Sequence, residues 1–331
     1  MKRIIFYASL VMVAFIVSCS EDFDPFAEAN QKYVLNCIVR CDTTYQTLTL
    51  TTTYMVTNYN PYSSTSDPSI KGAVIRLWEG NDKVTFFTDT TISRDSSSLY
   101  TTPYSIYHAR GIQPDPDTVV SIEAILPNGK KLTSSGTTPQ KPAFQKLGQL
   151  GGTGDTIVPP VGKSFVKAQW GEYTSVTGTV YYPRAYIVYT VPENGVTVRK
   201  TKMLPISYFT YEGVEYPEYP GLSYYPLLTI DTSIVNRCMK EISAGSSIDK
   251  ENYKIYALIV EVLSLDANLT TYYNATNKNK DPYAVKLYET DYSNIVGGYG
   301  IFGICFKAST SIDISAEYVR TFGYVHAYAK D

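Results

Sequence analysis

The chain of 331 residues has nearly equal numbers of positive and negative side chains and few histidines, and both features argue against particular classes of function. Its 29 Lys and Arg side chains nearly cancel its 31 Asp and Glu side chains and form no long basic run, so the sequence lacks the positive patch that nucleic-acid binding requires. His108 and His326 are its two histidines, and no group of Cys or His has the spacing of a metal site. We therefore predict no metal, no cofactor and no nucleic-acid partner.

Catalytic motifs are also scarce. His108 has no serine in a Gly-x-Ser-x-Gly turn to act with it, and His326 falls in an expected terminal strand. Asp115 and Asp117 could form an acidic pair, but close carboxylates are common in turns, and a glycosidase pair is defined by its distance across a cleft. The Gly-Gly-Tyr-Gly at 297–300 lacks the Lys-Ser/Thr of a phosphate loop and is better explained as a turn. We predict that the protein is not an enzyme.

One long apolar run is present, and it lies at the N-terminus. Lys2 and Arg3 precede the almost unbroken apolar run 4–17, which is too short to cross a bilayer and is typical of a secretory signal peptide. The run ends at Ser18-Cys19 in a pattern that resembles a bacterial lipobox, which implies cleavage after residue 18 and attachment of palmitate-like acyl chains to Cys19. At about 0.8 kcal/mol per buried methylene, these chains would anchor the protein permanently. An ordinary signal peptide with an unmodified Cys is the alternative.

Residues 19–31 are predicted to form the lipid anchor and a tether. Glu21, Asp22 and Asp24 closely follow Cys19, and acidic residues at this place resemble the surface-export signal of Bacteroidetes lipoproteins. We therefore expect a protein of the outer membrane that faces the cell exterior. The alternative is a tether that is acidic by accident, on a protein that faces the periplasm.

Composition and short alternating runs predict a mostly β fold with two β-sandwich domains. The chain contains 31 Tyr and is rich in Thr, Ser, Val and Ile, which favour strands. No helix period interrupts residues 32–138, so we predict an immunoglobulin-like β-sandwich there. The Pro-Asn-Gly-Lys at 127–130 predicts a hairpin turn. The strands expected in this domain are 33–40, 47–53, 73–79, 84–88, 119–126 and 131–134.

Residues 139–331 are predicted to form a second β-sandwich of fibronectin III-like type, because Trp170 on an early strand precedes a Tyr-rich strand. Helices near 231–244 and 265–278 interrupt it, each with a capping residue and an apolar face. The strands expected here are 165–170, 181–191, 196–202, 253–264, 301–306 and 318–329.

Four cysteines remain beyond Cys19. Cys37 and Cys41 share one face of a strand but are roughly 13 Å apart at about 3.3 Å per residue, too far for a disulfide. A bridge from either one to Cys238 or Cys305 would suit an oxidising compartment. The other interpretation, which we favour, is four buried thiols that behave as small hydrophobic side chains.

Tyrosine-rich segments are the best candidates for binding. Tyr offers a flat apolar face with a polar tip, and neighbouring Pro residues stiffen the chain, so such a surface suits a glycan, a peptide or another protein. The alternative is that these side chains simply cover a sheet edge. The candidate contact residues are Tyr208, Tyr211, Tyr216, Tyr219, Tyr224 and Tyr225, with Tyr59 and Tyr62 in a second loop.

Several segments together resemble a known family. They are the opening strand Tyr-Val-Leu-Asn-Cys-Ile-Val at 33–39, the Gly-Ala-Val-Ile-Arg-Leu at 72–77, the hairpin at 127–130, the Thr-Pro at 138–139, and the Ser-Asn-Ile-Val-Gly-Gly-Tyr-Gly-Ile-Phe-Gly at 293–303. This order resembles the Bacteroidetes outer-membrane lipoprotein family catalogued as domain of unknown function 4249. The resemblance implies a place beside a TonB-dependent outer-membrane transporter and transfers no functional residue. Asp-Thr pairs also resemble the O-glycosylation signal of these bacteria, at Thr43, Thr90, Thr118 and Thr156.

From these features we expect a non-enzymatic surface lipoprotein that helps a TonB-dependent transporter to capture a nutrient through its Tyr-rich segments. One alternative is an adhesin or fimbria-like structural protein, which would offer a donor strand or an incomplete sandwich. A surface hydrolase that uses His108 or the Asp115 and Asp117 pair is the second alternative.

Overall fold

The computed structural model describes residues 32–53, 67–94, 103–145, 156–157, 165–171, 179–277 and 292–328. The predicted signal peptide, Cys19, the tether, Tyr59 and Tyr62 lie outside these residues. Strands make up 54% and helices 12% of the structure, which confirms the predicted mostly-β class. Within the described part of the chain, no helix is both long enough and apolar enough to cross a membrane.

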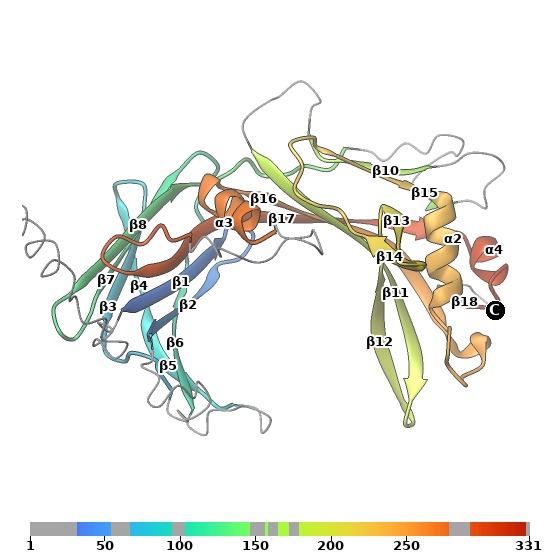
Figure 1. Cartoon of the computed structure of the whole chain (residues 1–331), viewed down its shortest axis with the longest axis horizontal. Coiled ribbons are helices and arrows are strands. Elements are labelled where there is room, and N and C mark those ends of the chain that lie inside the picture. The colour runs from blue at the N-terminus through green and yellow to red at the C-terminus, as the bar shows by residue number, and fades with distance from the viewer. Residues whose placement is uncertain are drawn as a thin grey trace, which may run out of the picture.

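One large sheet runs through the molecule (Figure 1). Its strands in chain order are β1 (Tyr33–Arg40), β2 (Tyr45–Thr52), β5 (Thr88–Ile92), β6 (Tyr104–Arg110), β9 (Thr156–Ile157), β11 (Val180–Glu193), β12 (Val196–Met203), β16 (Lys254–Leu265), β17 (Tyr299–Ile314) and β18 (Val325–His326). Side by side they follow the order β12-β11-β16-β17-β1-β2-β6-β5, with β18 paired to β16 and β9 paired to β17.

Smaller sheets and helices cover the large sheet. A four-stranded sheet has the order β4 (Lys83–Phe86), β3 (Val74–Glu79), β7 (Val119–Ile125) and β8 (Lys131–Thr137). Two further pairs are β10 (Phe165–Gln169) with β15 (Leu227–Asp231), and β13 (Ser207–Tyr211) with β14 (Val214–Glu218). The helical segments are α2 (Thr232–Glu241), η2 (Lys250–Asn252), α3 (Ala267–Asn277) and α4 (Ala316–Arg320).

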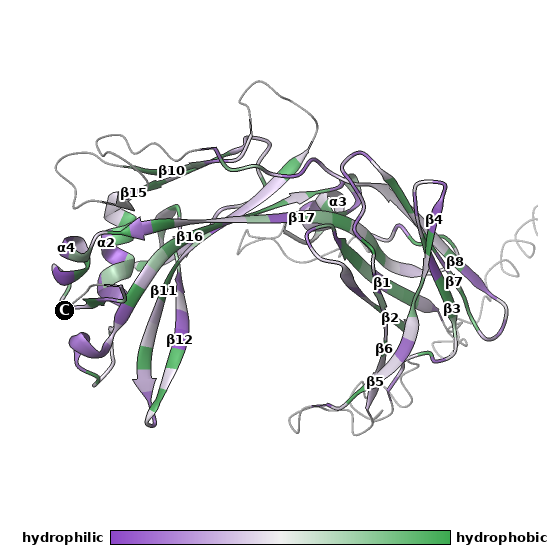
Figure 2. Ribbon diagram, turned by 180° about the vertical axis from the view of Figure 1, so that it is seen from behind, coloured by the Kyte–Doolittle hydropathy of each residue, from purple (hydrophilic) through white to green (hydrophobic). Residues whose placement is uncertain are grey.

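The molecule has two lobes, one that contains β1–β8 and one that contains β10–β15 (Figure 1), and strand β17 belongs to both. Its first part pairs in parallel with β1, from Val34 opposite Tyr299 to Arg40 opposite Cys305. Its second part pairs antiparallel with β16 and continues to Asp313. Strands β16 and β17 therefore run between the two lobes, as Figures 1 and 2 show from opposite sides.

The first core lies between the β4-β3-β7-β8 sheet and the β17-β1-β2-β6 part of the large sheet. Alternate residues of β1, namely Leu35, Cys37 and Val39, are fully buried in it, as expected for a strand with one face toward a core. Phe302 and Ile304 of β17 are buried in the same cluster. The sandwich predicted over 32–138 is therefore completed by residues near the end of the chain.

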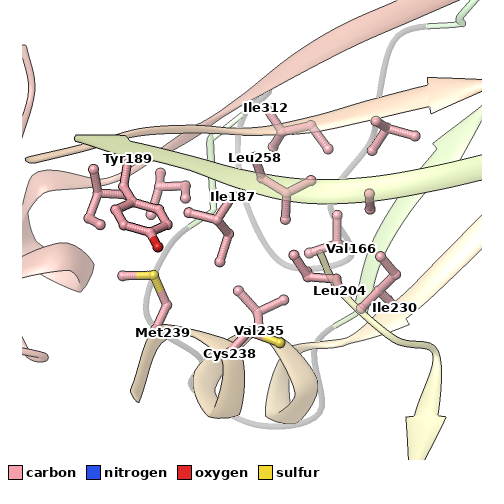
Figure 3. Close-up of a cluster of buried hydrophobic side chains, with 14 of the residues drawn as sticks. Val166, Ile187, Tyr189, Leu204, Ile230, Val235, Cys238, Met239, Leu258 and Ile312 are labelled. Atoms are coloured by element: carbon pink, nitrogen blue, oxygen red, sulfur yellow. The ribbon is translucent and has the colours of Figure 1, made fainter. Parts of the chain in front are cut away.

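The second core packs β11, β16 and the end of β17 against β10, β15 and helix α2. Trp170 is 1% exposed, and its ring meets those of Phe144 and Tyr181 edge to face at 6.0 and 5.8 Å. Figure 3 shows Val235 and Met239 of α2 pointing toward the sheet. The layer opposite the large sheet thus combines one strand pair with a helix.

Both predicted helices are present, each capped by an aspartate. Asp231 precedes α2, and its Oδ1 accepts the N–H of Ser233 at 2.7 Å. Asp266 precedes α3, and its Oδ1 accepts the N–H of Leu269 at 2.8 Å. Leu269 is buried in a third, smaller cluster with Cys305. Side-chain capping of free N–H groups therefore sets both helix starts.

The strand predicted over 318–329 is wrong. Residues Ala316–Arg320 form helix α4, because the Oγ of Ser315 accepts the N–H of Tyr318 at 3.2 Å and caps the first turn. Tyr318 and Val319 are then buried on one helix face. A short strand, Val325–His326, is the remaining part of the prediction that the structure contains. The prediction also omits strand β6 and the β13-β14 hairpin.

Close packing explains the glycines at 297–303. A Cβ at Gly300, whose φ is +111°, would lie 2.1 Å from the carbonyl oxygen of Leu35. A Cβ at Gly303 would lie 2.3 Å from Leu269, so α3 could not rest on β17. Asn294 closes the turn, since its amide donates to the carbonyl of Phe302 at 2.7 Å and its Oδ1 accepts the Phe302 N–H at 2.9 Å. This segment has a structural role, as its sequence predicts.

The cysteines Cys37, Cys41, Cys238 and Cys305 are buried free thiols. Cys41 packs in the first core and Cys238 in the second, while Cys305 packs with Leu269 on the opposite side of the sheet from Cys41. The structure therefore contains no bridge among these four. Burial raises the pKa of Cys37 and of Cys305 to about 12, which keeps both thiols protonated at neutral pH.

Candidate functional site

The segment predicted to bind contains a regular β-hairpin, β13-β14, that projects beside helix α2 (Figure 1). Glu212 and Gly213 form its turn with φ values of +48° and +78°, the conformation of the tight hairpin turn that matches strand twist. All five residues of β14 are exposed. The hairpin thus presents side chains from both strands to the surroundings.

Helix α2 holds the hairpin through Arg237. The guanidinium carbon of Arg237 lies 3.5 Å from the centre of the Tyr208 ring, which is close for a cation–π contact. Its Nη2 lies 3.0 Å from Glu215 Oε2 on β14, and its Nε lies 3.0 Å from Glu241 Oε1 on α2. Lys202 of β12 also pairs with Glu241 at 2.7 Å. One arginine therefore contacts both strands of the hairpin and fixes them to the helix.

Tyr208 is consequently a supporting residue and not part of the exposed face. Its hydroxyl lies 4.0 Å from the sulfur of Cys238, and burial raises its pKa to about 12. Tyr211, at the end of β13, is half-buried. Of the six candidate tyrosines in this segment, Tyr208 is thus directed toward helix α2.

The exposed face of the hairpin is aromatic. Phe209 and Tyr216 lie opposite each other across the two strands, with ring centres 5.7 Å apart and an angle of 26° between the ring planes. They are 51% and 42% exposed, so the stacked pair keeps much of its surface free. The sequence prediction included Tyr216 but missed Phe209, whose alternation with Tyr208 along a strand would have revealed it.

The remaining candidate tyrosines follow the hairpin. Tyr219, Tyr224 and Tyr225 are 40%, 65% and 64% exposed. Ser223 fixes this stretch to the large sheet, because its backbone exchanges two hydrogen bonds with that of Tyr181 at 2.8 and 2.9 Å. Together with Tyr216 on the hairpin, four of the predicted contact residues are therefore exposed. Arg237 holds this part of the chain at the hairpin, and Ser223 holds it at the large sheet.

The residues considered for catalysis are not brought together. The His108 ring lies beside that of Tyr45, with 5.9 Å between ring centres and a tilt of 33°, and its buried Nδ1 has no hydrogen-bond partner among the described residues. His326 accepts the N–H of Tyr328 at 3.3 Å. Asp115 and Asp117 lie in one exposed turn, where Asp117 Oδ2 accepts the Gln140 amide at 2.5 Å. Among the described residues, no three His, Cys, Asp or Glu side chains are grouped as metal ligands.

The candidate glycosylation residues differ in their surroundings. Thr43 lies in the turn after β1, where its Oγ1 accepts the N–H of Tyr45 at 3.3 Å. Thr90 lies on the edge strand β5, and Thr118 lies in the turn before β7. All three are partly exposed, while the side chain of Thr156 lies outside the described residues.

Comparison with models of known protein families finds no match for this chain. A search of curated proteins likewise finds no match. The interpretation of the site therefore depends on its geometry.

Proposed function

We propose that the protein is a surface-exposed outer-membrane lipoprotein that serves as a non-enzymatic accessory of a TonB-dependent transporter. In this proposal the lipid on Cys19 keeps the protein beside the transporter, so that a high effective concentration replaces strong intrinsic affinity. The β13-β14 hairpin and the following tyrosines supply the contact with the transporter. The signal peptide, the acidic tether and the family resemblance described above motivate this location.

The observation that carries the contact is the exposed Phe209 and Tyr216 pair on a rigid support. Stacked aromatic side chains bury a large apolar area in an interface and lose little conformational entropy. Arg237, Glu215 and Glu241 fix the hairpin before any partner arrives, which lowers the cost of ordering it on binding. A hairpin without such support would have to lose mobility when it bound.

The adhesin alternative requires a strand edge that accepts another strand. Strand β12 is one edge of the large sheet, and it carries Arg199, Lys200 and Lys202 within eight residues. Positive side chains on an edge strand oppose the addition of a further strand. At the β12 edge, this observation weighs against a donor-strand polymer.

The proposal is tested by gentle solubilisation of native membranes, capture through a C-terminal tag, and identification of the proteins that co-purify. We expect a TonB-dependent barrel in stoichiometric amount with the wild-type chain. With the double variant Phe209→Ala, Tyr216→Ala, we expect the amount of co-purified barrel to fall about tenfold or more. A factor of ten corresponds to roughly 1.4 kcal/mol of binding free energy.

Tyr45→Ala is the matched control, because Tyr45 is also an exposed tyrosine, at 43%, but lies on strand β2 and not on the hairpin. It should retain as much barrel as the wild type. Recovery of a monomer alone, or of copies of the same chain, would contradict the transporter role. Equal retention by the hairpin variant would contradict the assignment of the contact.

A further inference from the structure

The outer face of the β4-β3-β7-β8 sheet carries several exposed apolar side chains that no other element covers in the described structure. Val74, Phe86 and Val119 all point outward and are 52%, 59% and 54% exposed. Trp78 lies on the same face, partly exposed. Exposed apolar side chains that gather on one face are a feature of binding surfaces.

Strand register places small residues beside Trp78. Trp78 lies opposite Ser121 on β7, and Ser121 lies opposite Ser135 on β8. Neighbouring strands are about 4.8 Å apart, so the two serines extend about 10 Å from the indole. Beyond β8, Val296 pairs with Thr133 through two backbone hydrogen bonds at 2.8 and 3.1 Å. The small side chains of Ser121 and Ser135 therefore leave a hollow between Trp78 on one side and Val296 on the other.

These residues line a pocket of about 390 Å³. That volume falls within the range of small-molecule sites in proteins, about 300 to 1,000 Å³. Trp78 forms one side and Asn294 with Val296 contributes the other. The polar lining comes from hydroxyl groups: those of Ser121, Thr133 and Ser135 make no hydrogen bond to any described residue and remain available to a ligand.

The charged groups at the pocket are already paired with one another. Glu123 is the charged residue among the lining residues, and its carboxylate pairs with Arg76 through Oε1 and with Lys131 through Oε2. These two partners lower the pKa of Glu123, so it stays ionised and occupied at neutral pH. Arg76 also lies over one face of the Trp78 ring, with 4.9 Å between its guanidinium carbon and the ring centre. A ligand would thus meet the other face of the ring, free hydroxyls and charged groups that are already ion-paired.

We propose that this pocket binds a neutral oligosaccharide, with the apolar face of one pyranose ring against Trp78 and its hydroxyls bonded to Ser121, Thr133 and Ser135. A pyranose ring combines a C–H face with a rim of groups that donate and accept hydrogen bonds, which matches these side chains. A protein surface fits less well, because the hollow between Trp78 and Val296 has a polar floor. The site is separate from the β13-β14 hairpin and does not depend on the proposed transporter contact.

The chain offers its own reporter for this site, since Trp78 and Trp170 are its two tryptophans. Trp170 is 1% exposed in the second core and should not respond to a ligand. The probes are cellohexaose, xylohexaose, maltohexaose, mannohexaose and laminarihexaose, added to the full chain in a detergent without a sugar headgroup. We expect at least one of them to change the tryptophan emission in a saturable way.

Calorimetry with that oligosaccharide then compares variants whose fold is checked by circular dichroism. Trp78→Ala should weaken binding about tenfold or more, and Trp78→Phe should restore part of it. Phe209→Ala is the matched control and should bind sugar as the wild type does, even if it no longer retains a transporter. The proposal is overturned if no probe changes the emission, if Trp78→Ala binds as tightly as the wild type, or if only charged polygalacturonate binds.

Discussion

Asp266 gives the sharpest prediction for stability, because its carboxylate is buried and only half satisfied. It is 4% exposed, and while Oδ1 caps helix α3, Oδ2 makes no hydrogen bond of good geometry. Oδ2 lies against Gly136, where a Cβ would be 2.7 Å away. Burial raises the pKa of Asp266 from 3.8 to about 6.

The sign of the pH effect follows from this raised pKa. Between about pH 4 and pH 6 the folded protein holds a proton on Asp266 that the unfolded chain has released, so stability falls as the pH rises through this window. A pKa rise from 3.8 to about 6 corresponds to about 3 kcal/mol at most. Asp266→Asn keeps an oxygen to cap Leu269 and removes the charge. We expect it to stabilise the protein by about 1–2 kcal/mol above pH 7.

The assay is urea unfolding of the wild type and Asp266→Asn at several pH values between about 4 and 8. The difference between the two proteins should be near zero at the acidic end and grow as the pH rises, which separates Asp266 from all other titrating groups. Asp231→Asn is the control, because Asp231 caps α2 at an exposed position and its pKa is lowered by the Ser233 N–H. That variant should be no more stable than the wild type at any pH. A difference for Asp266→Asn that does not change with pH would refute the reasoning.

Three further predictions test the packing and the site. Gly300→Ala should lower the free energy of unfolding by about 3 kcal/mol, measured by urea unfolding, because its Cβ would meet the carbonyl of Leu35 in a backbone conformation that favours glycine; a variant as stable as the wild type would contradict the close approach. Arg237→Ala should speed hydrogen exchange of the amides in 207–218 while those of β16 stay protected, since it removes the contacts to Tyr208 and Glu215; unchanged exchange would show that Arg237 does not hold the hairpin. The four cysteines of the described chain should react with iodoacetamide only after unfolding, because they are buried and burial raises the pKa of their thiols; rapid alkylation of the native protein would refute their burial.

Sequence patterns predicted those elements whose information is local. The run at 33–40 alternates inward and outward residues and matches β1 at both ends. Helix α2 follows a capping aspartate and places Val235, Cys238 and Met239 on one buried face, as its spacing indicated. The Asn-Gly hairpin between β7 and β8 is present, with Gly129 at a φ of +82°. In each case the chemistry that fixes the backbone lies within a few residues.

The failures lie where distant contacts or competing local signals decide the outcome. Helix α4 contains residues that favour strands, but the Ser315 cap and the burial of Tyr318 outweigh that preference. The candidate site also combines local and distant information. The tyrosines could be read from the sequence, but the contacts of Arg237 with Tyr208 and Glu215 depend on a helix some twenty residues away. The Trp78 pocket was missed because its lining comes from strands β3, β7 and β8 and from Asn294. Only the register of those strands brings these side chains together.

Strand β17 connects the two candidate sites, because it contributes to the core beneath each of them. Its first half closes the core beneath the Trp78 pocket, and its second half pairs with β16 in the core that supports α2 and the hairpin. Neither core is complete without it, so the first 138 residues lack Phe302 and Ile304, which are buried in their own sandwich. Loss of such buried side chains costs several kcal/mol each, a large fraction of the stability of a domain. The two sites are therefore properties of one cooperative fold, and variants at either one must be compared in the full chain.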